Sequence, residues 1–172
     1  MNFFVLCLVL CVATHIIRTT YELLKIRNRI NPENKLVFAV IFSNMIILWL
    51  SWFSLNLADP VKLAFGPVVK YAGVAVLVCG TLFFILSLVK LKRFENYHGD
   101  LVTSGIFRYL RHPMYLGFIL WMAGSALFFQ SRSGCILAVV FTVNILIWKK
   151  LEEVQLMKVY TDYREYMKTT YF

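Results

Sequence analysis

The sequence predicts an all-α, polytopic integral membrane protein with about five transmembrane helices and a cytosolic C-terminal helical segment. Of its 172 residues, 60% are hydrophobic and only 16% are charged, a composition outside the range of soluble globular proteins. The charges lie in short blocks between apolar runs, some of them long enough to cross the roughly 30 Å hydrocarbon layer of a bilayer. The net charge of +9 follows this block pattern and forms no continuous basic face, so we expect no binding to nucleic acid.

The apolar runs predict the helices in order. Three lie in the first half of the chain, at 3–17, 36–57 and about 65–89. A fourth apolar region, 113–148, is too long for one crossing and is interrupted by Ser-Arg-Ser-Gly at 131–134. This turn predicts two antiparallel helices, of which the second is short. The first run has no basic residue before it and no small-residue cleavage site after it, so we expect a retained helix and no cleaved signal peptide.

Lysine and arginine are distributed unevenly between the two predicted sides of the membrane. Fifteen of the 18 lie in segments 18–35 and 90–112 and in the tail after Trp148, whereas the opposite side holds three. An excess of these residues marks the cytoplasmic side. We therefore expect the N-terminus outside and the C-terminus, together with the active site, in the cytoplasm. In a prokaryote the membrane would be the inner membrane.

The four cysteines predict neither a disulfide framework nor a metal site. Cys7 and Cys11 lie one helical turn apart in an apolar run, where cysteine behaves as a small apolar side chain. Cys79 and Cys135 lie in other predicted spans. We expect no metal ion.

The stretch LVTSGIFRYLRHPMYLGF, residues 101–118, places charges at the start of an apolar run. Pro113 directly after His112 predicts a helix start there. The N–H groups of Met114 and Tyr115 would then be unpaired donors at the positive end of the helix dipole. With the Arg-His pair beside them, they would hold a carboxylate or phosphate. Contacts to lipid phosphates and to the aromatic belt stay open as the alternative.

A second constellation, WKKLEEVQLMKVYTDYREYM, begins at residue 148. It places Glu152 and Glu153 just past the predicted membrane span, where carboxylates would bind a cationic group. A surface ion-pair patch with the two preceding lysines stays open as the alternative. A zwitterion that also carries a sulfonium would need both the helix end and the acid pair.

These motifs occur in the order found in a known family. LVTSG, then F, then RHPMYLG, followed by EE..L...Y and Y..Y, resemble the isoprenylcysteine carboxyl methyltransferase family and its relatives, the membrane phospholipid N-methyltransferases. The resemblance covers roughly residues 90–172. It implies a single membrane methyltransferase domain over 1–172. Three transmembrane helices in 1–89 would precede a cofactor-binding loop, a helical hairpin and the C-terminal segment in 90–172.

The resemblance also implies S-adenosyl-L-methionine as methyl donor and, as acceptor, a lipophilic small molecule, a prenylated molecule or a membrane lipid. By motif position, the cofactor-binding residues would be His98, Asp100, Leu101, Val102, Phe107, His112, Pro113, Met114, Tyr115 and Glu152. Arg111 and Glu153 would be catalytic, with Glu153 removing a proton where the acceptor is an amine. The acceptor would contact Trp121, Trp148 and Lys149.

The sequence departs from the family pattern at a few positions. Two residues, Gly-Asp, separate His98 from Leu101 where the protein-processing enzymes have one. Phe107 stands where tyrosine is usual. Trp148 replaces the arginine that binds the substrate carboxylate, with Lys149 as the nearest cation. We therefore expect weak or no activity on prenylcysteine carboxylates, and a lipid-like acceptor.

Other functions stay open. Phospholipid N-methylation is the alternative within the same chemistry. A membrane reductase would share an Arg-His motif but use a nicotinamide cofactor, and a non-enzymatic membrane adaptor would use neither. A transporter is disfavoured because the predicted spans contain almost no ionisable residues.

Overall fold

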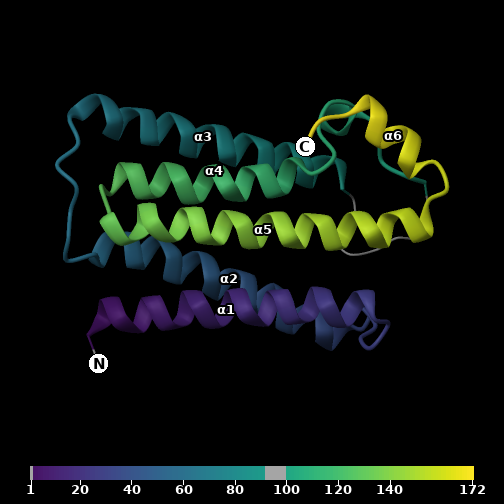
Figure 1. Ribbon diagram of the computed structural model, residues 1–172, viewed down its shortest axis with the longest axis horizontal. Helices are drawn as coiled ribbons and strands as arrows, with labels where there is room; N and C mark the ends of the chain where they lie inside the picture. Colours follow the sequence, from purple (N-terminus) through teal and green to yellow (C-terminus); the bar gives the residue numbers. More distant parts are fainter. Residues whose placement is uncertain (1, 92–99) are drawn as a thin grey trace.

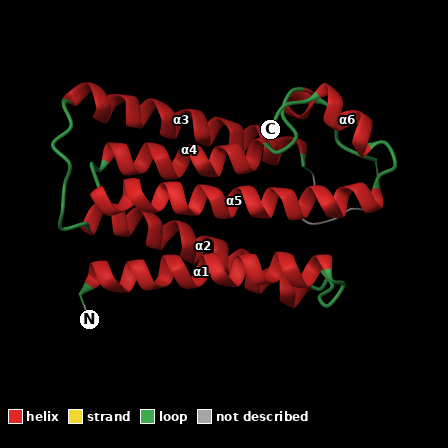
Figure 2. Cartoon of the chain, in the orientation of Figure 1, coloured by secondary structure: helices red, strands yellow, loops and turns green. Residues whose placement is uncertain are grey.

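The computed structural model describes residues 2–91 and 100–172. Its helices, in chain order, are α1 (Phe3–Ile26), α2 (Lys35–Ala58), α3 (Pro67–Lys90), the 3₁₀ turn η1 (Gly105–Arg108), α4 (Pro113–Phe128), α5 (Arg132–Val159) and α6 (Tyr163–Thr169) (Figure 1). Within the described ranges there is no β-strand (Figure 2). The all-α prediction is confirmed.

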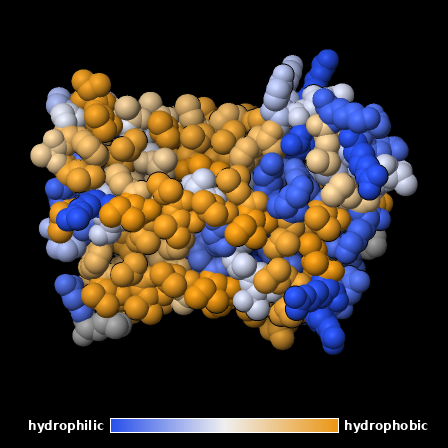
Figure 3. All heavy atoms as spheres, viewed as in Figure 1, coloured by the Kyte–Doolittle hydropathy of each residue, from blue (hydrophilic) through white to orange (hydrophobic). Residues whose placement is uncertain are grey.

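Four helices, α1, α2, α3 and α5, are long and apolar enough to cross a membrane. Helix α4 is apolar but has 16 residues, fewer than the roughly 20 that span a bilayer. Large apolar side chains are exposed along these helices. Figure 3 shows an apolar surface over the middle of the bundle and hydrophilic residues gathered at the end that carries the C-terminal segment. The protein is therefore a polytopic membrane protein, with four full-length spans and one short apolar helix.

The hairpin of α4 and α5 differs from the prediction in which of its helices is short. Helix α5 has 28 residues and continues past Trp148 to Val159, so the expectation of a short second helix is wrong. The charges after Trp148 pair within the helix. Lys149 Nζ and Lys150 Nζ lie 3.5 and 3.8 Å from carboxylate oxygens of Glu153. Such pairs at three- and four-residue spacing stabilise a helix beyond its apolar part.

Helix α1 also continues beyond its apolar run, to Ile26. Glu22 pairs with Arg18 one turn before it (Nη2–Oε1, 2.5 Å) and with Lys25 after it (Nζ–Oε2, 2.8 Å). All three side chains are buried. The sequence predicted that 18–35 connects two helices, and this is wrong for 18–26, which are part of α1. The ion pairs allow these charges to lie on an inward-facing surface of the helix.

Glycines bring α3 and α4 into close antiparallel contact. A Cβ atom added to Gly80 would lie 2.8 Å from the carbonyl oxygen of Gly117, and one added to Gly124 would lie 2.8 Å from that of Gly73. Small residues at such positions let membrane helices approach closely. This packing places the N-terminus of α4 beside the C-terminus of α3.

The opposite end of the bundle is closed by hydrogen bonds to Asp59. Its Oδ2 accepts from Ser131 Oγ at 2.6 Å and from the backbone N–H of Ser133 at 2.7 Å, and its Oδ1 accepts from the N–H of Val61 at 3.0 Å. Burial opposes ionisation, but these hydrogen bonds outweigh it and lower the pKa of Asp59 below its ordinary value. The loop between α2 and α3 is thereby fastened to the start of α5.

Candidate active site

The C-terminal segment, residues 160–172, folds back over the loop that precedes α4 (Figure 1). The Tyr166 hydroxyl donates to the carbonyl oxygen of Phe107 at 2.5 Å. The backbone N–H of Tyr171 donates to the Tyr109 carbonyl at 2.8 Å, and the Tyr171 carbonyl accepts from the N–H of Arg111 at 3.1 Å. These bonds join two stretches of chain that lie more than fifty residues apart in the sequence.

Arg111 links the C-terminal segment to α5. Its Nη1 donates to the carbonyl oxygens of Met167 at 3.0 Å and Thr170 at 2.5 Å. Its Nε donates to Glu153 Oε1 at 3.3 Å. The guanidinium fork therefore holds carbonyls of one element and a carboxylate of another.

Glu153 is almost fully buried, with 3% of its surface exposed. Besides Arg111, its Oε1 lies 3.5 Å from Lys149 Nζ and 3.6 Å from His112 Nε2. A buried carboxylate of this kind is stabilised in its charged form by the surrounding cations. Its neighbours indicate that it holds the surrounding elements in position.

A cavity of about 1250 Å³ lies at this end of the bundle and reaches between the helices. Its polar wall comes from the loop before α4 and from the C-terminal part of the chain, and consists of Asp100, Arg111, His112, Glu152, Tyr160, Tyr163 and Tyr166. Its apolar wall comes mainly from α2, α3 and α4, and includes Phe38, Phe42, Met45, Trp49, Phe84, Phe118 and Trp121. Since a site for one small molecule usually occupies about 300–1,000 Å³, this volume could accommodate two.

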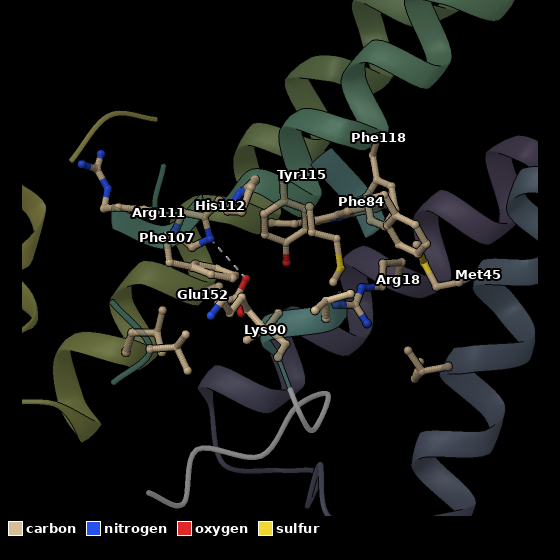
Figure 4. Close-up of a pocket in the computed structure, with 18 of the residues that line it drawn as sticks. Arg18, Met45, Phe84, Lys90, Phe107, Arg111, His112, Tyr115, Phe118 and Glu152 are labelled. Atoms are coloured by element: carbon tan, nitrogen blue, oxygen red, sulfur yellow. Dashed lines mark ion pairs between the residues drawn. The ribbon is translucent and has the colours of Figure 1, made fainter. Parts of the chain in front are cut away.

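His112 occupies the N-cap position of α4, and Pro113 is the first residue of the helix. His112 Nδ1 lies 3.7 Å from Glu152 Oε2, the ion pair drawn in Figure 4. On the other side of the ring, Nε2 lies 3.3 Å from the Tyr163 hydroxyl. Helix start, imidazole and carboxylate therefore meet at one wall of the cavity.

Two of the three tyrosines at this wall, Tyr163 and Tyr166, keep their phenol protons near neutral pH. Burial, followed by the charges of Glu153 and Glu152, raises the pKa of Tyr163 above its ordinary value. Burial also raises the pKa of Tyr166 to about 12, although the nearby Arg111 opposes the shift. Both hydroxyls therefore keep a proton to donate, and that of Tyr166 goes to the Phe107 carbonyl.

The structure brings most of the predicted site residues to this cavity. Nine of the proposed cofactor-binding residues line it: Asp100, Leu101, Val102, Phe107, His112, Pro113, Met114, Tyr115 and Glu152. The tenth, His98, lies outside the described residues. Arg111, Trp121 and Trp148 also line the cavity, whereas Glu153 and Lys149 are not among its described lining residues. Lys149 Nζ instead lies 4.7 Å from the centre of the Phe172 ring.

Sequence reasoning missed the contribution of α1, because its charges were assigned to a loop. Arg18 and Tyr21 line the cavity, and the Arg18 guanidinium carbon lies 5.9 Å from the centre of the Trp148 ring. The signal was present in the sequence. Arg18, Tyr21, Glu22 and Lys25 recur at the three- and four-residue spacing of a single helix face.

Residues 68–163 match the family model described as phospholipid methyltransferase. The match covers more than half of the chain and contains the motifs around His112 and Glu152. The chain belongs to the phospholipid methyltransferase family. The α3–α4 hairpin, the start of α4 and the acid pair on α5 are therefore parts of this family's shared region.

Two curated relatives match part of the chain. The protein-S-isoprenylcysteine O-methyltransferase A of Arabidopsis thaliana is 35% identical over 77 residues, which cover 45% of this chain and 34% of that protein. The protein-S-isoprenylcysteine O-methyltransferase B of Arabidopsis thaliana is 45% identical over 38 residues, which cover 22% and 18%. The matches thus span about a third or less of the length of these relatives. No solved structure matches the chain significantly.

Proposed function

We propose that this membrane protein is an S-adenosyl-L-methionine-dependent methyltransferase that modifies a lipophilic acceptor at the cytoplasmic face of the membrane. The observation that carries the proposal is a continuous cavity that joins a polar wall, built on the family's shared motifs, to an apolar wall between membrane helices. A polar methyl donor and a lipophilic acceptor could meet there.

The donor groups on the polar wall suit the amino-acid end of S-adenosyl-L-methionine. The N–H groups of Met114 and Tyr115 lie at the start of α4, the positive end of the helix dipole. They would bind the carboxylate of the cofactor. His112 at the N-cap would add a further donor. Glu152 would bind the ammonium group.

The remaining parts of the cofactor also find suitable residues. Leu101, Val102 and Phe107 line the cavity next to the polar wall and would contact the adenosyl group. The Tyr115 ring would lie near the sulfonium, which an aromatic face attracts. When bound, this cofactor supplies an electrophilic methyl group.

The protein's own task is then to orient two ligands and to exclude water, effects that can each contribute several kcal/mol to lowering the barrier. The C-terminal segment closes the cytoplasmic side of the polar wall through its bonds to Phe107 and Tyr109. We assign to Arg111 and Glu153 the role of holding the C-terminal segment in this position. This assignment replaces proton removal by Glu153, because its carboxylate is paired with the cations Arg111 and Lys149.

The acceptor would reach the cavity laterally from the bilayer, along the apolar wall. Trp49, Phe84 and Trp121 form an aromatic cluster there, with ring centres 4.8–5.1 Å apart for the pairs that include Trp121. The names of the two relatives suggest a prenylated cysteine as acceptor, whereas the family description suggests a phospholipid. Because Trp148 stands where the resemblance predicts a carboxylate-binding arginine, we keep a phospholipid as the second candidate acceptor.

The decisive experiment uses the purified protein in lipid nanodiscs. S-adenosylhomocysteine should bind, as measured by calorimetry. With a radiolabelled methyl donor, the protein should label one of three acceptors: an artificial prenylcysteine, an aminophospholipid or a component of a total lipid extract. Binding of a nicotinamide cofactor in place of S-adenosylhomocysteine would instead indicate a reductase, and binding of neither would favour an adaptor.

A further inference from the structure

Arg18 brings a charge to the cavity from outside the region that defines the family. The other acidic and basic side chains that line the cavity all lie within residues 68–163: Lys90, Asp100, Arg111, His112 and Glu152. Arg18 lies on α1, fifty residues before that region begins. The family match therefore does not account for this cation, and a chain-specific role is open to it.

The Arg18 side chain is held firmly, with 11% of its surface exposed. Its guanidinium carbon lies 5.1 Å from the centre of the Tyr21 ring and 5.9 Å from that of Trp148. Trp148 is itself fixed, because its Nε1 donates to Thr19 Oγ1 at 2.8 Å. The pair with Glu22 adds a further restraint. A preorganised guanidinium loses little conformational entropy when it binds a ligand.

Arg18 lies where the two walls of the cavity meet. In Figure 4 its side chain extends into the space between Glu152 and Lys90 on one side and Met45 and Phe84 on the other. A molecule with its tail along the apolar wall and its head at the polar wall would pass this guanidinium.

A buried guanidinium distinguishes strongly between anionic and neutral partners. Its planar fork matches the two oxygens of a carboxylate or phosphate, and such charge-assisted bonds are roughly twice as strong as neutral ones. A neutral head group at the same place would desolvate the cation without offering a comparable bond.

We propose that Arg18 binds the anionic oxygen atoms of the acceptor's head group, which makes the acceptor a lipophilic acid. This inference rests on the proposed function and narrows its substrate class. It also alters an expectation from the sequence. The position where the resemblance predicts an arginine holds Trp148, but Arg18 places a guanidinium against that ring from a different helix.

The test measures binding without requiring turnover. Three tryptophans, Trp49, Trp121 and Trp148, line the cavity, so intrinsic fluorescence in nanodiscs reports occupancy. Two pairs of probes share a tail and differ in charge. N-acetyl-S-farnesylcysteine is compared with its amide, and dodecyl phosphate with dodecanol. The first pair tests a carboxylate and the second a phosphate.

The variants are Arg18→Gln and Arg18→Lys, with Arg29→Gln as the matched control because Arg29 is exposed just beyond the same helix. For at least one pair, the unmodified protein should bind the anion about tenfold or more tighter than its neutral partner. Arg18→Gln should reduce this preference to less than about threefold. Arg18→Lys should keep the charge but lose the planar fork, and so weaken the preference about threefold. Arg29→Gln should leave it unchanged.

The outcomes separate this inference from the proposed function. If the unmodified protein shows no preference for either anion, or if Arg18→Gln retains the preference, Arg18 is not the anion-binding group. Should Arg18→Gln fail to fold, an unchanged preference in Arg18→Lys overturns the inference in the same way. Calorimetry with S-adenosylhomocysteine runs in parallel. Its failure counts against the methyltransferase, whereas the probe pairs still decide the role of Arg18.

Discussion

Glu152 and Glu153 are neighbours in the sequence, but their carboxylates lie in different surroundings. Glu152 lines the cavity and pairs with His112 Nδ1 at 3.7 Å, and 27% of its side chain is exposed. Glu153 is buried and contacts Arg111, His112 and Lys149 at 3.3–3.6 Å. Successive residues on a helix point about 100° apart, so one acid can face a ligand while the other holds the scaffold.

Glu152→Ala should weaken binding of S-adenosylhomocysteine by about 1.5–3 kcal/mol, the usual cost of losing a charged hydrogen-bond partner. The fold should be retained, because Glu152 is partly exposed to the cavity. Calorimetry in nanodiscs would measure the affinity. Glu165→Ala is the control, since Glu165 is exposed on α6 and pairs only weakly with Lys168 at the surface. Equal affinity in the two variants would rule out this role for Glu152.

Arg111→Gln should release the C-terminal segment. The substitution removes the bonds to the carbonyls of Met167 and Thr170 and leaves the buried Glu153 without one of its cations. Hydrogen exchange at residues 160–172 should become faster by about tenfold or more, since a charged hydrogen bond contributes about 1.5–3 kcal/mol.

Arg108→Gln is the control for this change, because Arg108 lies three residues before Arg111, at the end of η1, and is exposed. S-adenosylhomocysteine should bind more weakly to Arg111→Gln, as the segment that covers the polar wall is loosened. Unchanged exchange in residues 160–172 would show that Arg111 does not hold the segment and would favour a direct role in the reaction.

The sequence grouped residues that line one cavity in the structure, because the family motifs are local, while the roles of these residues stay predictions. Pro113 determines where α4 starts, and the acid pair lies on the next helix, α5. The contribution of α1 could not be derived in the same way. An apolar-run search ends at the first charge, and it cannot recognise that Glu22 pairs with both Arg18 and Lys25 within the helix. The same search ended the last span at Trp148, whereas α5 continues through the acid pair as one helix, in which Glu153 pairs with Lys149 and Lys150.

Gly80→Val should destabilise the protein and displace the start of α4. A Cβ atom at this position already meets the Gly117 carbonyl at 2.8 Å, and backbone cannot move aside without separating α3 from α4. Overpacking of this kind costs about 1–3 kcal/mol. The matched control is Ala72→Val on the exposed face of α3. Thermal unfolding in detergent should show a lower Tm for Gly80→Val, and an equal Tm in both variants would contradict the close contact.

The orientation of the bundle can be tested without reference to the reaction. Arg18 and Lys25 are buried on α1, so they no longer count as loop charges. Of the fifteen basic residues on the predicted cytoplasmic side, thirteen remain, against three on the other. Because the imbalance persists, we still expect the end that holds the C-terminal segment to face the cytoplasm.

The measurement is cysteine labelling in intact cells, with the four native cysteines replaced by alanine. Arg132→Cys, at the exposed start of α5, should react with an impermeant maleimide from outside. Lys168→Cys, exposed on α6, should react only after the membrane is permeabilised. The two positions lie at opposite ends of the bundle (Figure 1), so each serves as the control for the other. The reverse pattern would place the cavity's polar wall outside the cell, where a cytosolic methyl donor could not reach it.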